Sequence, residues 1–417
     1  MSGLVKHFQN DMKNIPQLSN NWGSMINLLD KVLVEGFNFV PIISVVKSSS
    51  DAITATISLG SGHGFIDRQV VRIAGSTNGW DGDYKVLSAN TDSVVVECAA
   101  TNPIAINGVA SCSTAPLDFE IVFRTPAGSK KPKRAYRSKD PESLGLILLV
   151  HDFCVSGAAA TGAKFAKIGV VSSMSDIDTI TGTQMPFDPK KPNANWGWDG
   201  TNHGWAKWYY ANPAYWNSWD QRTDADSPDD GNRGYSLVGD KSSFILNISE
   251  NMCSPLFGCV EFFDPTYQGK NLCLLANGAN TSALRQSIAT YGGGRQGYAQ
   301  TLNDEYYLSD NSFNQRGLMW FDTHGIHNPV VLGRYYIPVF QGDSNWGQIW
   351  GAESSNQHIF LQELIVDSSN NFRGVLPFLR KPTKKSNETV ITEEGKTIVR
   401  FYADRGQHWF GLCLESR

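Results

Sequence analysis

The chain has 417 residues, and its 36 lysines and arginines against 40 aspartates and glutamates give a formal net charge of −4 at pH 7. This length exceeds what one hydrophobic core organises, so two or three domains are expected, and the weakly acidic balance excludes a chain-wide basic surface for nucleic acid. Only 18% of the residues are charged, against about 25% in an average globular protein. A surface with so few charged residues is more typical of a permanently assembled protein than of a free monomer.

The sequence shows neither a secretory signal nor a membrane span. Residues 1–17 are polar and include Pro16, and the apolar run 144–150 is far shorter than the roughly 20 residues that a spanning helix needs. That run predicts a buried strand instead. Seven cysteines without a CxxC pair favour buried, reduced thiols over a disulfide framework: Cys98, Cys112, Cys154, Cys253, Cys259, Cys273 and Cys413.

The first predicted element is an amphipathic helix that starts near Ser24, a possible cap, and ends at Gly36, where a helix normally stops. Its apolar residues recur at helical spacing: Met25, Ile26, Leu28, Leu29, Val32 and Leu33. Two interpretations stay open, since such a helix either packs on its own β domain or docks onto a neighbour.

Residues 51–112 predict a compact β module. Apolar and polar residues alternate along 53–59, and short strands follow at 69–73, 84–87 and 93–97. Asn-Gly at 78–79 and Asp-Gly at 81–82 supply the positive φ angles that tight turns need. No residue of the module is arranged for chemistry.

Strands also dominate the rest of the chain, with long loops between them. They are predicted at 119–123, 144–150, 243–246, 258–263, 330–332, 334–339, 358–366, 389–391 and 397–401. The basic loops 130–134 and 380–385 lack interleaved aromatic residues, so they indicate solvated tips or contacts with an acidic partner and no nucleic-acid site.

The module resembles a small β module of phage and bacterial surface proteins. The matching pieces are a strand at 55–57, a His-Gly loop at 63–65, a strand at 70–75, a turn and strand at 80–86, and a valine-rich strand at 94–96. Such a module is a reused spacer, so it points to an extracellular or virion setting and not to one activity.

Further short motifs extend the resemblance along the chain, at residues 22–38, 135–138, 174–179, 237–240 and 373–377. In this order they are similar to a family of tailed-phage virion structural proteins. The central aromatic region and much of 250–360 depart from that family. The resemblance implies a role in virion assembly, in the tail or baseplate, and it implies no catalytic residues.

Half of the twelve tryptophans lie between residues 195 and 220, beside tyrosine, asparagine and aspartate: Trp196, Trp198, Trp205, Trp208, Trp216 and Trp219. Indole faces next to amides and carboxylates are typical of sugar-binding surfaces. Large aromatic residues also stabilise long loops and anchor subunit interfaces. We favour packing or subunit contact over glycan binding.

Other chemical motifs are weak. Residues 224–232 fail the EF-hand pattern, because Pro228 replaces a ligand and no glutamate stands at position 12. His324 and His327 beside Asp322 lack a third ligand and a helical context. No nucleophile elbow, phosphate loop or dinucleotide fingerprint is found, so we expect no enzyme, no cofactor and no metal.

The sequence therefore predicts a mostly β, multidomain protein. Its parts are an N-terminal arm and helix (1–40), a small sandwich- or barrel-like β module (41–116) and a larger β-rich domain (117–417). A division of the larger domain into two subdomains near residue 250 stays open. We expect a structural tail or baseplate protein of a phage particle, assembled in the host cytoplasm with copies of itself in a symmetric ring and with other phage proteins, without membrane insertion. A host-glycan-binding tail protein and a polysaccharide-degrading enzyme are the alternatives.

Overall fold

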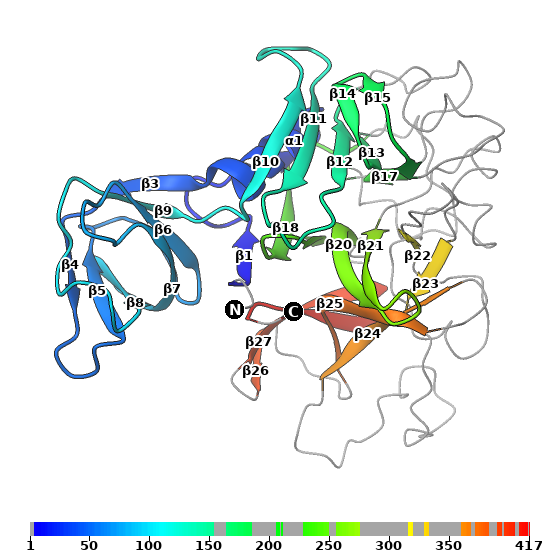
Figure 1. The fold of residues 1–417 in the computed structure, drawn as a ribbon. Helices are drawn as coiled ribbons and strands as arrows, with labels where there is room; N and C mark the ends of the chain where they lie inside the picture. Colours follow the sequence, from blue (N-terminus) through cyan, green and yellow to red (C-terminus); the bar gives the residue numbers. More distant parts are fainter. Residues whose placement is uncertain are drawn as a thin grey trace.

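A computed structural model describes fourteen segments of the chain. They are residues 4–153, 164–185, 206–208, 210–211, 228–249, 256–275, 316–319, 329–332, 360–367, 372–382, 390–393, 396–404, 408–415 and 417. Within them the fold is mostly β and multidomain, with several antiparallel sheets and one short N-terminal helix, as the sequence predicts. Figure 1 shows a small module on one side and a larger body on the other.

The largest sheet belongs to the body and runs as an antiparallel meander in the order β1-β18-β19-β20-β21-β22-β23-β24-β25-β28-β27-β26, with β2 on β18. Its strands are β1 (Lys6–Gln9), β2 (Leu18–Ser19), β18 (Asn232–Gly239), β19 (Phe244–Ser249), β20 (Leu256–Asp264), β21 (Gly269–Leu275), β22 (Arg316–Met319), β23 (Pro329–Leu332), β24 (Phe360–Asp367), β25 (Phe372–Pro382), β26 (Val390–Glu393), β27 (Lys396–Asp404) and β28 (His408–Cys413). The N-terminal strand thus pairs with a strand more than 200 residues later in the chain.

A second sheet has the order β10-β11-β12-β13-β16, with β17 also on β13. Its strands are β10 (Phe119–Arg124), β11 (Lys133–Ser138), β12 (Ile147–His151), β13 (Ala166–Val171), β16 (Gln184–Met185) and β17 (Ala206–Trp208), and the hairpin β14 (Met174–Asp176) and β15 (Thr179–Ile180) stands beside it. All five residues of β12 are buried, which confirms the predicted buried strand.

The two sheets pack face to face, because the main core contains side chains from both. Phe119, Leu148 and Ile168 of the second sheet share this core with Leu237 and Leu246 of the large sheet. A second core covers the opposite face of the large sheet, where β24, β25 and β28 return over β19–β21. Strands buried on both faces read as continuous apolar runs in the sequence.

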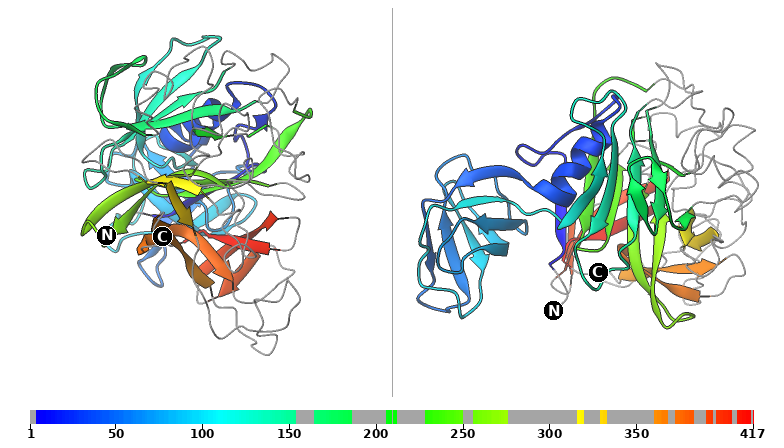
Figure 2. Two further views of the ribbon diagram at one scale, coloured as in Figure 1. Left: turned by 90° about the vertical axis from the view of Figure 1, so that its right-hand side faces the viewer. Right: turned by 45° about the horizontal axis from the view of Figure 1, so that its top comes forward.

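The predicted helix is present as α1 (Ser24–Leu29) and continues as a π-helix, η1 (Asp30–Glu35). Gly36 ends it with a φ of 75°, as the sequence indicates. All six predicted apolar residues are buried in the main core, so the helix packs on its own chain. It lies on the side of the body that is nearer the module (Figure 2).

The module is a seven-stranded sheet in the order β3-β9-β6-β7-β8-β5-β4. Its strands are β3 (Phe37–Pro41), β4 (Ser44–Lys47), β5 (Thr54–Ser58), β6 (Val70–Ala74), β7 (Gly82–Ala89), β8 (Ser93–Glu97) and β9 (Ser111–Thr114). Backbone bonds from Ile42 to Ala110, from Ile106 to Val45 and from Lys47 to Ile104 curl the sheet around its own core, which includes Trp80.

Most predicted strands are confirmed within a residue or two, including all four in the module. The strand predicted at 334–339 lies outside the described residues. The sequence analysis misses the other described strands, among them β1, β11, β13, β21 and β25. β1 is short and gains its place by pairing with β18, more than 200 residues later in the chain. The division into domains stays a prediction.

Candidate functional site

The module's loops are built for structure. His63 is buried: its Nε2 bonds the carbonyl of Asn90 at 2.8 Å, and its Nδ1 accepts from the backbone N–H of Phe65 at 3.0 Å. The side chain of Asn38 in turn donates to the carbonyl of His63. Both ring nitrogens therefore make hydrogen bonds that stabilise the loop, and the His-Gly motif has a structural role.

One face of the module, formed by β4, β5 and β8, points away from its core. The register places Val46 beside Thr56 and Thr56 beside Val95, while the alternate residues Val45, Ile57 and Val94 are buried. We call the outward-pointing residues the outer face: Ser44, Val46, Thr54, Thr56, Ser58, Ser93, Val95 and Glu97. Its side chains are mostly serine, threonine and valine, and it contains no lysine or arginine.

Exposed large apolar side chains are also concentrated in this region. Of the twelve among the described residues, eight lie between residues 39 and 109. They are Phe39, Ile43, Val46, Ile53, Ile66, Leu87, Ile104 and Val109. Val46 and Ile53 lie at or next to the outer face, and Ile104 belongs to the segment that pairs with β4. Among the described residues, exposed apolar side chains are thus concentrated in the module.

A charged cluster joins the module to the body. Asp83 on β7 accepts from Arg72 on β6 at 2.6 and 2.9 Å and from Lys6 on β1 at 2.5 Å. Arg72 also donates to Asp118 at 2.8 Å, and Lys6 to the carbonyl of Pro116. The hydrogen bond to Asp83 raises the pKa of Arg72 above its usual value. We call Lys6, Arg72, Asp83 and Asp118 the seam cluster.

A second contact lies nearby. Glu415, close to the C-terminus, is 3.5 Å from Arg68 and 3.4 Å from Lys85 of the module, and it accepts from the N–H of Thr397 at 2.9 Å. His7 lies buried beside these charges, and its desolvation lowers its pKa to about 4. The imidazole is therefore neutral at pH 7, and the seam gains no charge from it.

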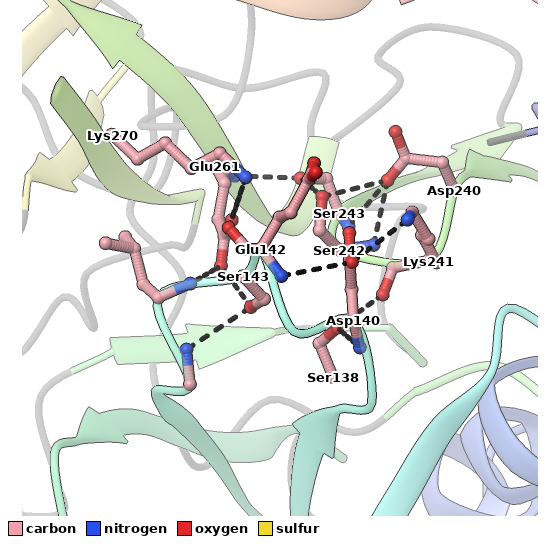
Figure 3. Close-up of polar contacts among 12 residues, drawn as sticks. Ser138, Asp140, Glu142, Ser143, Asp240, Lys241, Ser242, Ser243, Glu261 and Lys270 are labelled. Atoms are coloured by element: carbon pink, nitrogen blue, oxygen red, sulfur yellow. Dashed lines mark hydrogen bonds and ion pairs between the residues drawn. The ribbon is translucent and has the colours of Figure 1, made fainter. Parts of the chain in front are cut away.

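Figure 3 shows a polar network between the two sheets of the body. In the β18–β19 turn, Asp240 accepts from the N–H groups of Ser242 and Ser243 at 2.9 and 3.0 Å, and Arg417 binds its other oxygen at 2.6 Å. Across the gap, Ser138 donates to the carbonyl of Lys241 at 2.6 Å. The network ties the 138–144 loop, the turn and the last residue together.

Glu261 is the buried carboxylate of this network. Its Oε1 accepts from the hydroxyl of Ser143 at 2.5 Å and from the N–H of Leu144 at 2.8 Å. Its Oε2 is buried, with Lys270 3.9 Å away and no hydrogen-bond donor in the described part of the chain. Burial raises its pKa. Through these two bonds Glu261 holds the 143–144 loop of the second sheet against the large sheet.

Asp152 performs the capping that the sequence assigns to Ser24. Its Oδ2 accepts from the N–H groups of Met25 and Ile26 at 2.9 and 3.2 Å, and Oδ1 accepts from the hydroxyl of Tyr210 at 2.6 Å. Ser24 makes no capping bond. A cap from more than 120 residues away has no local sequence signal, so the prediction for Ser24 is wrong.

Of the six tryptophans in the aromatic region, only Trp208 is among the described residues. It is fully buried: its Nε1 donates to the carbonyl of Leu275 at 2.8 Å, and its ring stacks on Phe257 with centroids 5.8 Å apart. No face of this indole is open to a sugar. Trp196, Trp198, Trp205, Trp216 and Trp219 lie outside the described residues.

The basic loop at 130–134 connects β10 and β11 as a hairpin, whose tip stands at the top of Figure 1. Lys133 pairs with Asp178 and Arg134 with Asp30, at 3.0 Å for the latter. Arg124, Lys130 and Lys131 are exposed, and no carboxylate of the described segments pairs with them. We call these three residues the hairpin cations.

The remaining predicted chemical sites are only partly described. Asp229 and Asp230 of the acidic loop bond Arg233 and Asn20, whereas the 322–327 loop lies outside the described residues. Within the described segments there is no group of three or more potential metal ligands. The five described cysteines are free thiols, and burial raises the pKa of Cys112 to about 12.

No described helix has the length and apolar character that crossing a bilayer demands. No protein-family model matches the chain, and no curated protein matches it. Among solved structures it is similar to the phage phi92 endosialidase, at 10% sequence identity and a TM-score of 0.16, over 90% of this chain and 52% of that one. The chain thus spans about half the length of the endosialidase. A likeness at this TM-score carries no argument.

Three kinds of residue escape the sequence analysis: the cap Asp152, the seam cluster and Glu261. Glu261 has a usable signal, because it stands between apolar residues in a strand whose other positions are almost all buried. A lone carboxylate in such a run must find a partner. Arg72 within the apolar strand β6 gives the same signal for the seam.

Proposed function

We propose that this chain is a structural subunit of a tailed-phage particle, in the tail or baseplate, that works by binding its neighbours and not by catalysis. One observation carries the proposal: the motifs that resemble the virion family coincide with the joints of this structure. Each motif supplies a contact that fixes one element to another. The motifs therefore lie where this fold is held together.

The joints can be followed one by one. Tyr136 of the 135–138 motif donates to Asp30 of the helix at 2.7 Å. Asp240 of the 237–240 motif receives the C-terminal arginine. Arg373 of the 373–377 motif pairs with buried Asp264 at 2.6 Å. A buried, hydrogen-bonded ion pair fixes orientation even where it adds little net stability.

The module adds the contact function. Two sets of ion pairs clamp it to the body, and β4 and β5 of its outer face lie on the far side of the module (Figure 1), with exposed Val46 and Ile53 on or next to that face. A rigidly mounted, exposed, apolar surface is typical of proteins that spend their working life in an assembly. We infer partners among copies of this chain and other phage structural proteins, and a location in the particle.

The test is the composition of purified particles. Particles from a strain that carries the gene are banded on a density gradient, washed at high salt and digested for mass spectrometry, and an antibody to the chain is located by immunogold microscopy. We expect the chain to remain with intact particles at a fixed ratio to the other structural proteins. Its absence from infectious particles would overturn the proposal.

A further inference from the structure

The outer face of the module lacks the charged side chains that usually prevent a solvent-facing surface from associating with other chains. Solvent-facing surfaces of soluble domains usually intersperse charges of both signs, which limits contact with other chains. Here the eight outward positions of three neighbouring strands contain serine, threonine and valine and a single charge, Glu97. A surface with so few charges is typical of the core of a protein interface.

The exposed charge of the module is negative, and two of its carboxylates lie on or beside the outer face: Glu97 belongs to it, and Asp51 accepts from the side chain of Thr54. The module's five exposed carboxylates are Asp51, Asp67, Asp81, Asp92 and Glu97. Its four cations are all engaged: Arg72 with Asp83, and Arg68 and Lys85 with Glu415. Lys47 pairs in register with buried Ala55, so it belongs to the inward set, and it donates to carbonyls at 2.8 and 3.1 Å. A partner for this face should therefore be basic.

The chain carries such a partner surface itself. The segment 124–134 has five lysines and arginines and no acidic residue. Two of them are paired within the body, which leaves the three hairpin cations at an exposed tip. Without internal carboxylates they repel one another, and an acidic surface would relieve this repulsion.

The two surfaces lie on different sides of the molecule. In Figure 1 the hairpin tip points upward from the body, whereas β4 and β5 form the far side of the module, and the second view of Figure 2 agrees. The seam cluster fixes the module in this position, so the tip of one chain does not reach its own outer face. A second copy is required.

We propose that the hairpin cations of one copy bind the outer face of the next, head to tail, with Glu97 and Asp51 at the rim of the contact. The proposal rests on the assembly function inferred above and names the partner as a second copy of this chain. A head-to-tail contact uses two different surfaces, so it builds closed rings or open chains and not a simple dimer.

The test is sedimentation velocity of the full chain up to about 100 µM, which detects any contact tighter than that value. Two double variants change the charge of the two surfaces separately. Lys130→Glu with Lys131→Glu makes the hairpin acidic, and Thr56→Lys with Glu97→Lys makes the outer face basic. None of these four side chains makes a hydrogen bond that holds the described fold. We expect each pair to weaken self-association by at least about tenfold.

Mixing the two variants provides the decisive arm. The acidic hairpin of the first variant can bind the basic outer face of the second, and the original hairpin of the second can bind the original outer face of the first. The mixture should therefore assemble again, with the two variants in alternating order. A misfolded variant would not recover on mixing. The control, Lys31→Glu, reverses an exposed charge on the helix that belongs to neither surface nor to the seam cluster, and it should leave association unchanged.

The outcomes separate this inference from the proposed function. A chain that stays monomeric, or variants that fail to restore each other, would overturn the head-to-tail contact even when the chain is present in particles. Self-association with the expected charge dependence, in a chain absent from particles, would support the contact and refute the particle role.

Discussion

Replacing Asp152 by asparagine should remove a defined part of the pH dependence of stability. Burial is the main cause that raises the pKa of Asp152, from 3.8 to about 7. In the protonated acid, Oδ2 still accepts from Met25 and Ile26, while a proton on Oδ1 is donated to Tyr210. The Tyr210 hydroxyl then donates to the carbonyl of Asn21, 2.9 Å away. Asparagine reproduces this arrangement atom for atom.

The sign follows from linkage. Below pH 3.8 the carboxyl is protonated in both the folded and unfolded states, so its stabilisation is fully present. Between pH 3.8 and about 7 only the unfolded state releases the proton, and folding free energy is lost at about 1.4 kcal/mol per pH unit. The total loss is about 4 kcal/mol and levels off above pH 7.

The assay is urea unfolding of the wild type and Asp152→Asn from pH 4 to 8, with the difference between the two as the measured quantity. This difference cancels other titrating groups, such as Glu261, and should grow in favour of the variant as the pH rises. Asp152→Ala serves as the control, because it removes the cap and should be destabilised by about 1–2 kcal/mol even at pH 4. A difference that stays constant with pH would refute the reasoning.

Two further substitutions test the packing. Trp208→Ala removes a fully buried ring and should destabilise the chain by about 3–5 kcal/mol. Trp208→Phe loses chiefly the hydrogen bond to Leu275 and should cost far less. Equal losses of stability in thermal melts would contradict the assignment of Trp208 to the core. Gly258→Ala would push a methyl into the carbonyl oxygen of Phe244 and should lower the melting temperature, while Gly269→Ala, with only the Tyr267 carbonyl 3.7 Å away, should leave it nearly unchanged.

The strands could be predicted because their signal is local. In the module, inward residues such as Val94 and Val96 alternate with outward ones, and the turn dipeptide at 81–82 marks the hairpin between β6 and β7. The sequence also predicts the burial of the 144–150 run and the end of the helix at Gly36. These features depend on neighbours within a few residues.

The joints could not be predicted, because they depend on residues far apart in the chain. Asp152 caps a helix more than 120 residues earlier, and Lys6 reaches Asp83 across 77 positions. No spacing rule connects such pairs. A charged residue inside an apolar strand indicates that a polar partner must exist, but only the fold shows which residue that partner is. For Trp208, the sequence favours packing or subunit contact over glycan binding, and only its neighbours on β19 and β20 show that it belongs to the core of its own chain.

The seam cluster matters for assembly as well as for the fold. In a head-to-tail contact the angle between the hairpin and the outer face sets the rotation from one copy to the next, and a ring closes only if that angle is constant. The module is linked to the rest of the chain by its two chain connections, by the ion pairs and by hydrogen bonds such as those from Lys13 to the carbonyl of Gly62 and from Gln69 to Met12. Because Lys6 and Asp83 are largely buried, salt screens their attraction less than it screens an exposed pair.

Weakening this cluster should therefore change the shape of the assembly more than its strength. Asp83→Asn keeps the side-chain volume but removes the charge that Arg72 and Lys6 share, so the module gains rotational freedom about its two connections. We expect one closed species in the wild type and a ladder of open chains in the variant by native mass spectrometry, with unchanged circular dichroism. Lys31→Ala breaks an exposed pair on the helix and should keep the closed species. If Asp83→Asn also keeps it, the seam does not set the angle.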